Sequence, residues 1–323
     1  MSQIQNSKIL VTGGAGFIGS NLSEKLLQQN NHVIVLDNLL TGKIQNIEDL
    51  KSYPQFEFIE GDIRNLEICK QAVSQCDYVF HQAALGSVPR SVEDPATSTE
   101  ININGTLNVF IAAKDEKVKH IVFASSSSVY GDSKHLPKTE DLLGNPLSPY
   151  AVTKRCNEFH AQNFRDLYGL KITGLRYFNV FGPRQDTDSI YAAVIPKFVK
   201  AFMTGESPII NGDGSYSRDF TYVENVLHAN ELAAVTDADE LVFNVACGGK
   251  TTLLELVQQI QEILAHYNPN IKDIPIQFAP NRAGDIPHSM ADISRSVKSL
   301  NYQPLYNWEE GLKKACEWYW RNL

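Results

Sequence analysis

Short apolar runs alternate with longer, helix-length segments through the first half of the chain. The runs are rich in β-branched and aromatic residues and occupy residues 8–12, 32–36, 56–59, 78–80 and 121–123. Continuous apolar runs of this length are typical of strands that are buried on both faces, and their regular separation predicts βαβ units. The pattern therefore predicts an α/β protein built on a doubly wound parallel sheet of the Rossmann type.

The second half of the chain has a different character. Residues 171–177 continue the strand series and one more strand is predicted near residues 241–246, but turn-rich segments such as 211–215 separate the shorter elements there. We expect residues 1–180 to form the Rossmann domain, to which the strand near 241–246 returns. Residues 181–323 are expected to form mainly a smaller α/β lobe that binds substrate, because loops on a rigid scaffold commonly carry specificity.

A glycine-rich turn follows the first predicted strand and opens the first predicted helix. Gly13 permits a tight turn, Gly16 allows the backbone to approach a pyrophosphate, and Gly19 allows the helix to pack closely on the strand. The second strand ends in Asp37, whose carboxylate is suited to accept both hydroxyls of an adenosine ribose and repels a 2′-phosphate. The combination predicts bound NAD rather than NADP, although glycines alone would also suit a packing turn without a ligand.

Two further segments border the predicted cofactor site. Asp62 follows the third strand and is placed either to reach the adenine edge or to cap the next helix. Gln82, Ala83 and Ala84 close the fourth strand, where small side chains leave room for a cofactor.

A tyrosine and a lysine lie four residues apart at the start of a predicted helix. Tyr150 and Lys154 therefore share one helix face, and Pro149 is typical of a helix start. A nearby lysine and a cationic nicotinamide favour the phenolate form of a tyrosine, which then acts as a base. The serines at 125–128 end the fifth strand, where one hydroxyl can bond the oxygen that Tyr150 deprotonates. A polar transition from strand to loop is the alternative for these serines.

Taken together, these motifs and the segment 175–183 resemble the extended short-chain dehydrogenase/reductases that act on nucleotide sugars. The chain is most similar to the UDP-glucose/UDP-N-acetylglucosamine 4-epimerase group, and within it to bacterial enzymes of surface-polysaccharide pathways that prefer N-acetylated substrates. The resemblance implies reversible NAD-dependent 4-epimerisation of UDP-N-acetylhexosamines through a transient 4-keto sugar. It also implies that Ser126 is the catalytic hydroxyl, Tyr150 the base and Lys154 the lysine that binds ribose.

Motifs and resemblance together predict the residues around each ligand. The residues expected at NAD are Gly13, Gly16, Phe17, Ile18, Gly19, Asp37, Asn38, Gly42, Asp62, Ile63, Gln82, Ala83, Ala84, Tyr150, Lys154, Tyr177 and Val180. The residues expected at the UDP-sugar are Ser87, Ser126, Ser127, Ser128, Asn179, Ala193, Val194, Lys197, Asn211, Arg218, Arg282, Asp285 and Ser289. Within this set the arginines are expected to neutralise the diphosphate through charge-assisted hydrogen bonds.

Two departures from neighbouring families narrow the predicted reaction. In 4,6-dehydratases an Asp-Glu pair follows the catalytic hydroxyl, whereas this chain has Ser127 and Ser128, which disfavours dehydration. Epimerases restricted to glucose have a large tyrosine seven residues after the diphosphate arginine, whereas this chain has Ser289. A small side chain there opens volume for a 2-N-acetyl group, unless Ser289 is a plain loop residue.

Other functions stay open at this point. The segment 86–91 also resembles epimerases of N-acetylated sugars and their uronic acids, so a UDP-N-acetylhexosaminuronate is a second candidate substrate. A nucleotide-sugar decarboxylase or dehydratase and an NAD-binding regulatory protein are further alternatives. By resemblance we expect a homodimer that pairs the helix at 104–117 with the helix beginning at Tyr150.

Composition excludes several classes of partner and site. The formal net charge of -8, without a basic patch, argues against nucleic-acid and anionic-membrane partners. The 5 cysteines are scattered and the 8 histidines lack metal-ligand spacing, so we predict neither disulfides nor a metal site. The first residues lack the pattern of a signal peptide, and a cytoplasmic location is expected.

Overall fold

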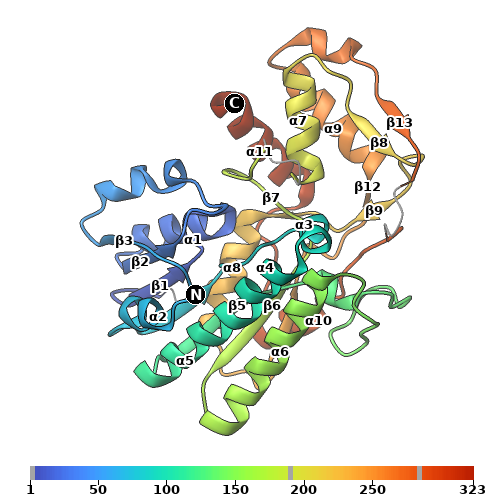
Figure 1. The fold of residues 1–323 in the computed structure, drawn as a ribbon. Coiled ribbons are helices and arrows are strands. Elements are labelled where there is room, and N and C mark those ends of the chain that lie inside the picture. Colours follow the sequence, from blue (N-terminus) through green and yellow to red (C-terminus); the bar gives the residue numbers. More distant parts are fainter. Residues whose placement is uncertain (1–3, 188–191, 282–285) are drawn as a thin grey trace.

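A parallel sheet of seven strands forms the centre of the molecule (Figure 1). The computed structural model describes residues 4–187, 192–281 and 286–323. The strands of the sheet are β1 (Lys8–Thr12), β2 (His32–Asp37), β3 (Phe56–Glu60), β4 (Tyr78–His81), β5 (His120–Ser126), β6 (Ile172–Tyr177) and β11 (Val242–Val245). Their order is β11-β6-β5-β4-β1-β2-β3, and every pair is parallel. This is the Rossmann order with one added edge strand, and it confirms the predicted fold.

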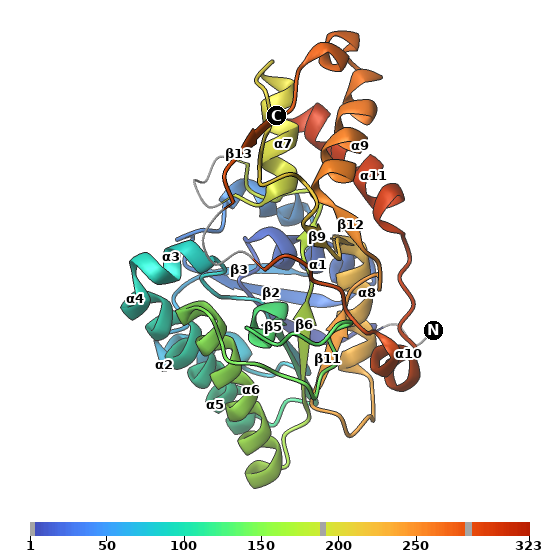
Figure 2. The same cartoon turned by 90° about the vertical axis from the view of Figure 1, so that its right-hand side faces the viewer.

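Helices cover both faces of this sheet and produce three layers. Ile9 and Val11 of β1 point into a buried cluster with the helices α1 (Phe17–Gln28) and α8 (Val223–Ala234). Leu10, on the opposite face, packs with the other set, which comprises α2 (Leu66–Val73), α5 (Thr106–Glu116) and α6 (Pro149–Tyr168). Figure 2 shows α5 and α6 on one side of the sheet and α8 on the other. Burial on both faces is the physical reason for the continuous apolar runs.

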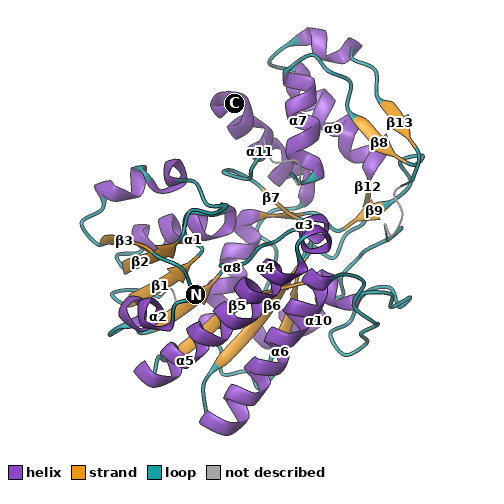
Figure 3. Cartoon of the chain, in the orientation of Figure 1, coloured by secondary structure: helices purple, strands orange, loops and turns teal. Residues whose placement is uncertain are grey.

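The second lobe is built mainly from helices and short paired strands (Figure 3). Its helices are α7 (Val194–Met203), α9 (Leu253–Ala265) and α11 (Trp308–Asn322). Its strand pairs are β7 (Val180–Phe181) with β10 (Thr221–Tyr222), β8 (Ile209–Asn211) with β13 (Gln277–Ala279), and β9 (Ser217–Arg218) with β12 (Thr251–Thr252). The shorter helices of the chain are α3 (Val88–Glu93), α4 (Pro95–Thr99), α10 (Ser294–Leu300), the 3-10 helices η1 (Ile44–Ile47), η2 (Asp49–Ser52), η4 (Ser127–Tyr130) and η5 (Pro269–Asp273), and the π-helix η3 (Glu100–Gly105).

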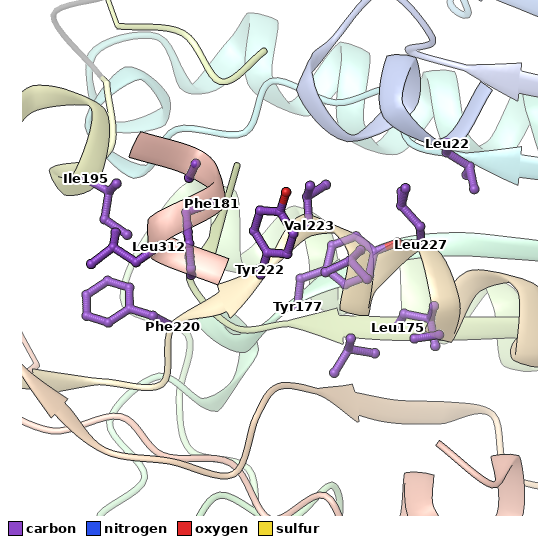
Figure 4. Packing of buried hydrophobic residues seen from close by; sticks show 14 of the residues in the cluster. Leu22, Leu175, Tyr177, Phe181, Ile195, Phe220, Tyr222, Val223, Leu227 and Leu312 are labelled. Atoms are coloured by element: carbon purple, nitrogen blue, oxygen red, sulfur yellow. The ribbon is translucent and has the colours of Figure 1, made fainter. Parts of the chain in front are cut away.

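One hydrophobic core runs through both lobes. The cluster extends from Leu22 of α1 and Leu175 of β6, through Phe181 and Tyr222, to Leu312 of α11 (Figure 4). Because this one cluster contains side chains of the sheet and side chains of the second lobe, their packing holds the two lobes in a fixed relation. The strand β11 also joins the lobes, because it follows segments of the second lobe in the sequence but pairs in parallel with β6 of the sheet.

A buried histidine at the amino end of β5 predicts a pH dependence of stability. His120 is 5% exposed, and its Nε2 lies 2.9 Å from Thr173 Oγ1. Burial, helped by the positive charge of Lys171, lowers the pKa of His120 to about 4, whereas the unfolded chain has about 6.5. Because the pKa of His120 is lower in the folded state than in the unfolded state, its contribution to the free energy of unfolding is fully present above about pH 6.5. Its contribution is lost as the pH falls toward 4.

We expect His120→Gln to weaken this pH dependence, because glutamine does not titrate. Between pH 7 and pH 5 the free energy of unfolding should fall by about 2 kcal/mol less in the variant than in the wild type. Urea unfolding of both proteins at both pH values measures the difference. An identical fall in both proteins would mean that the pKa of His120 is the same in the folded and unfolded states.

Candidate active site

A cleft of about 470 Å³ opens at the carboxyl edge of the sheet, within the size range of ligand pockets. Its walls come from the glycine-rich turn, from the ends of β2, β4, β5 and β6, from the first turn of α6 and from residues of the second lobe. The strand order reverses between β1 and β4, so the cleft lies where open α/β sheets bind ligands. This position identifies the candidate active site.

The glycine-rich turn leaves no space for side chains and presents a helix N-terminus to the cleft. A Cβ on Gly19 would lie 2.1 Å from Gly13 O, and a Cβ on Gly13, at φ +67°, would lie 2.6 Å from Ala83 N. Gly16 is the N-cap of α1 and lines the cleft, and it offers no side-chain oxygen to the first N–H groups of the helix. Such uncapped N–H groups suit a bound phosphate.

Asp37 is fixed at the end of β2 with its carboxylate beside the glycine-rich turn. Its Oδ2 accepts a hydrogen bond from Ala15 N at 3.0 Å, and its Oδ1 accepts one from Leu39 N at 2.8 Å. Burial raises the pKa of Asp37, and the two backbone hydrogen bonds oppose that rise. A Cβ on Gly42 would lie 2.8 Å from Oδ1, so only glycine fits against the carboxylate. These residues fit the adenosine half of NAD.

Asp62 fills neither the helix-cap position nor the wall of the cleft, and its predicted place at the adenine edge stays a prediction. The N-cap of α2 is Asn65, whose side chain accepts from Glu67 N and Ile68 N, so the prediction that Asp62 caps this helix is wrong. The carboxylate of Asp62 instead accepts hydrogen bonds from Asn38 Nδ2 and from Arg64 Nε and Nη2. The guanidinium of Arg64 lowers the pKa of Asp62 to about 2. Asp62 does not line the cleft, whereas its neighbour Ile63 does.

The three predicted reacting groups meet inside the cleft. Lys154 Nζ donates to Ala124 O at 2.7 Å and lies 5.8 Å from the ring centroid of Tyr150. Tyr150 and Ser126 both line the cleft, and the Ser126 hydroxyl is close enough to the phenol to affect its pKa. Burial raises the pKa of Tyr150, and the Ser126 hydroxyl opposes that rise. Burial lowers the pKa of Lys154 to about 8, and Glu158 opposes that fall.

A neutral histidine supports the floor of the cleft. His81 Nδ1 lies 2.6 Å from Thr12 Oγ1, and its Nε2 lies 2.8 Å from Thr106 Oγ1. Burial, helped by the positive charge of Lys154, lowers the pKa of His81 to about 3, so the ring is uncharged near neutral pH. The two hydrogen bonds tie the carboxyl end of β4 to β1 and to α5, which fixes the ends of the strands relative to one another.

Most of the predicted NAD residues and some of the predicted sugar residues line this cleft. Those that line it are Gly13, Gly16, Phe17, Ile18, Gly19, Asp37, Asn38, Gly42, Ile63, Gln82, Ala83, Ala84, Ser87, Ser126, Tyr150, Lys154, Tyr177, Asn179, Val180 and Ala193. The glycine-rich turn and the ends of parallel strands converge at one sheet edge, which is why residues far apart in the sequence meet there.

Other predicted substrate residues lie off the wall of the cleft. They are Ser127 and Ser128 in η4, Val194 and Lys197 in α7, Asn211 in β8, Arg218 in β9, and Ser289. Ser127 and Ser128 are turned away because the chain bends into a 3-10 helix directly after Ser126. Arg282 and Asp285 lie outside the described residues.

Sequence reasoning missed charged residues at the mouth of the cleft. Lys43 and Asp186 both line it, and their Nζ and Oδ1 atoms lie 2.7 Å apart. Arg184 lines the cleft as well, and its Nη2 lies 2.6 Å from Glu24 Oε2. The turn at residues 182–184, which follows the strand predicted at 171–177, was the available signal, because loops at this sheet edge contact ligands.

The comparison with protein families decides the family of the chain. The sequence profile of the NAD dependent epimerase/dehydratase family matches residues 9–246. The chain belongs to this family. The match confirms the predicted dependence on NAD.

Solved structures of two epimerases resemble the chain along nearly its whole length. One is a UDP-N-acetylglucosamine 4-epimerase from Methanobrevibacter ruminantium M1 in complex with UDP-N-acetylmuramic acid, at TM-score 0.93 and 40% identity, over 99% of this chain and 100% of that one. Another is a UDP-glucuronic acid 4-epimerase from Bacillus cereus with UDP-glucuronic acid and NAD, at TM-score 0.87 and 31% identity, over 98% and 100%.

A curated relative agrees with these structures. A putative UDP-glucose 4-epimerase from Methanocaldococcus jannaschii is 39% identical over 312 residues, which cover 96% of this chain and 97% of the relative. The chain thus belongs with the UDP-sugar 4-epimerase family, as its motifs predict. In the part of the chain that the structure describes, no helix is long and apolar enough to cross a membrane.

Proposed function

We propose that the protein is an NAD-dependent 4-epimerase that interconverts UDP-GlcNAc and UDP-GalNAc. The observation that carries the proposal is the meeting of Ser126, Tyr150 and Lys154 in the cleft that begins with the glycine-rich turn. The likeness to the UDP-N-acetylglucosamine 4-epimerase of Methanobrevibacter ruminantium supports the same substrate class.

The side chains account for both proton transfers of the proposed reaction. When bound, NAD supplies a hydride acceptor at the sugar C4 and later a hydride donor. Tyr150, as phenolate, removes the proton of the 4-hydroxyl, and Ser126 hydrogen-bonds the same oxygen. The ammonium of Lys154 and the cationic nicotinamide favour the phenolate against the effect of burial. After the 4-keto sugar has rotated in the cleft to present its opposite face, Tyr150 returns the proton, and no net oxidation results.

Dehydration is disfavoured by the groups next to Ser126. Elimination of water from C5 and C6 needs an acid and a base beside the sugar, and the chain has Ser127 and Ser128 at the positions of the dehydratase pair. Hydroxyl groups with ordinary pKa values do neither job near neutral pH.

Ser289 lies off the wall of the cleft, and the proposal that it admits the 2-N-acetyl group is supported by the resemblance to epimerases; a substitution tests it. Its N–H donates to Ser217 O at 3.1 Å, which ties the segment to β9. We expect Ser289→Tyr to depress turnover of UDP-GlcNAc by about tenfold or more and to spare UDP-glucose, because a ring removes volume that only the acetyl group needs. Turnover of both sugars by NMR measures the selectivity, with Ser289→Ala as the control that keeps the volume. An equal loss of turnover on both sugars would mean that residue 289 does not control the space around the 2-substituent of the sugar.

Proton NMR of the purified protein with UDP-GlcNAc and, separately, UDP-GlcNAcA tests the function itself. No cofactor is added, and the sugar H1 and H4 signals are followed. Conversion of UDP-GlcNAc to its galacto isomer supports the proposal, and faster conversion of UDP-GlcNAcA would assign the enzyme to the uronic acids instead. Unchanged spectra with both sugars would overturn it in favour of a decarboxylase of another substrate or an NAD-binding regulatory protein.

Three further expectations accompany the proposal. Homodimerisation through α5 and α6 stays a prediction, and it is supported by Val152 and Phe159 of α6, which are 45% and 55% exposed. A cytoplasmic location and a boundary between cofactor and substrate lobes near residue 180 likewise stay predictions.

A further inference from the structure

Two successive residues at the carboxyl end of β5 are each tied to α6 by a different bond. Ala124 O accepts from Lys154 Nζ at 2.7 Å, and Ser125 Oγ donates to Glu158 Oε1 at 2.7 Å. Lys154 and Glu158 are four residues apart and so share one face of the helix. The end of the strand is therefore bonded to α6 one residue after another, and the next residue along the strand is Ser126.

The acceptor of the Ser125 bond is itself immobilised. Glu158 is 2% exposed, and its carboxylate accepts from Arg176 Nε at 2.8 Å and Nη2 at 2.9 Å. Arg155 Nη1 donates to the same carboxylate at 2.8 Å. With two guanidinium groups and one hydroxyl on it, the carboxylate has a single position. Ser125 is 2% exposed, so water does not replace the bond.

We infer that Ser125, anchored on Glu158, is a positioning residue that sets Ser126 against Tyr150 for proton transfer. Successive side chains of a strand leave it in alternating directions, so fixing Ser125 on Glu158 also fixes the direction in which Ser126 leaves the strand end. Ser126 Oγ also accepts from Ser128 N at 3.1 Å, and the two contacts together define where its hydroxyl lies. The inference rests on the proposed roles of Ser126 and Tyr150.

Ser125→Ala removes only this hydroxyl. We expect kcat to fall about tenfold, because a small misplacement of a reacting group is costly, while KM and the amount of bound NAD stay unchanged. Ser296 provides a matched control, since it is 0% exposed and its Oγ donates to Asn244 O at 2.6 Å, in α10 and away from the cleft. Ser296→Ala should lower the melting temperature similarly and leave kcat as in the wild type.

A double-mutant cycle separates positioning from general weakening of the fold. If Ser125 acts through Ser126, Ser125→Ala should slow the wild type about tenfold but change kcat less than twofold in a Ser126→Ala background, which keeps Tyr150 and measurable turnover. A tenfold loss in both backgrounds would make Ser125 merely structural and overturn the inference. So would a kcat of Ser125→Ala within twofold of the wild type. Failure of the wild type to convert any UDP-sugar would instead reject the proposed function.

Discussion

Tyr150→Phe is expected to lower turnover by about a thousandfold, because it deletes the only atom of Tyr150 that accepts the proton from the sugar. The fold around it should survive the change. Tyr150 N donates to Ser91 Oγ at 3.0 Å through the backbone, and Ser148 caps the helix by accepting from Ala151 N. Lys154 keeps its bond to Ala124 O. NAD content and affinity for the UDP-sugar should therefore match the wild type.

Three measurements separate these effects. NMR rates give turnover, the NAD released on denaturation gives the NAD content, and calorimetric titration with UDP-GlcNAc gives the affinity for the UDP-sugar. Tyr168→Phe is the matched control, since Tyr168 ends the same helix and is 55% exposed. It should leave all three unchanged. Undiminished turnover of Tyr150→Phe would place the proton transfer on another group, and loss of NAD from it would mean that the phenol holds the cofactor.

The central sheet could be predicted because its physical cause is local in the sequence. Strands such as β1 and β5 are buried on both faces, which forces continuous apolar runs, and the runs mark them within one or a few residues. The glycine-rich turn is equally local, since contacts within and beside the turn exclude side chains at Gly13 and Gly19. Tyr150 and Lys154 share a helix face by spacing alone.

The substrate side of the site was harder to predict, because it depends on how distant segments meet. A 3-10 helix after β5 removes Ser128 from the cleft wall, and a run of four serines contains no signal for that bend. Asp62 was one predicted cap of α2, but Asn65 caps the helix and the guanidinium of Arg64 binds Asp62 instead. The pairing of Lys43 with Asp186 joins loops of the two lobes, which no local pattern reports.

Breaking the buried ion pair of Arg176 and Glu158 is expected to lower the free energy of unfolding more than any other substitution tested for stability. Arg176 is 1% exposed, and its Nη1 also donates to Tyr130 Oη at 3.1 Å and to Glu140 O at 2.8 Å. Burial acts to raise the pKa of Glu158, but the hydrogen bonds of Arg176 together with those of Ser125 and Arg155 lower it. Arg176→Met leaves this carboxylate buried with much weaker compensation. We expect a loss of about 3–5 kcal/mol in the free energy of unfolding.

The loss should depend on pH in a defined direction. In the wild type the lowered pKa of Glu158 adds stability above its unfolded value, and this is lost as the pH falls. Without Arg176, burial raises the pKa of Glu158, so the deficit is greatest at neutral pH and shrinks as acid protonates the carboxyl. Urea unfolding at pH 7 and pH 5 measures both deficits. A deficit that grows toward pH 5 would contradict the assigned cause.

Removing both charges should restore most of the stability that removing one destroys. The double variant Glu158→Leu/Arg176→Met buries an apolar pair of similar volume, and such replacements are often neutral. Arg155→Met is the control, because Arg155 is 32% exposed at its side chain and its loss should cost less than about 1 kcal/mol. Equal stability of the single and double variants would assign the cost to the contacts of Arg176 with Tyr130 and Glu140. The double variant should be stably folded but should still turn over UDP-sugar slowly, because Ser125 no longer has the Glu158 carboxylate as its hydrogen-bond acceptor.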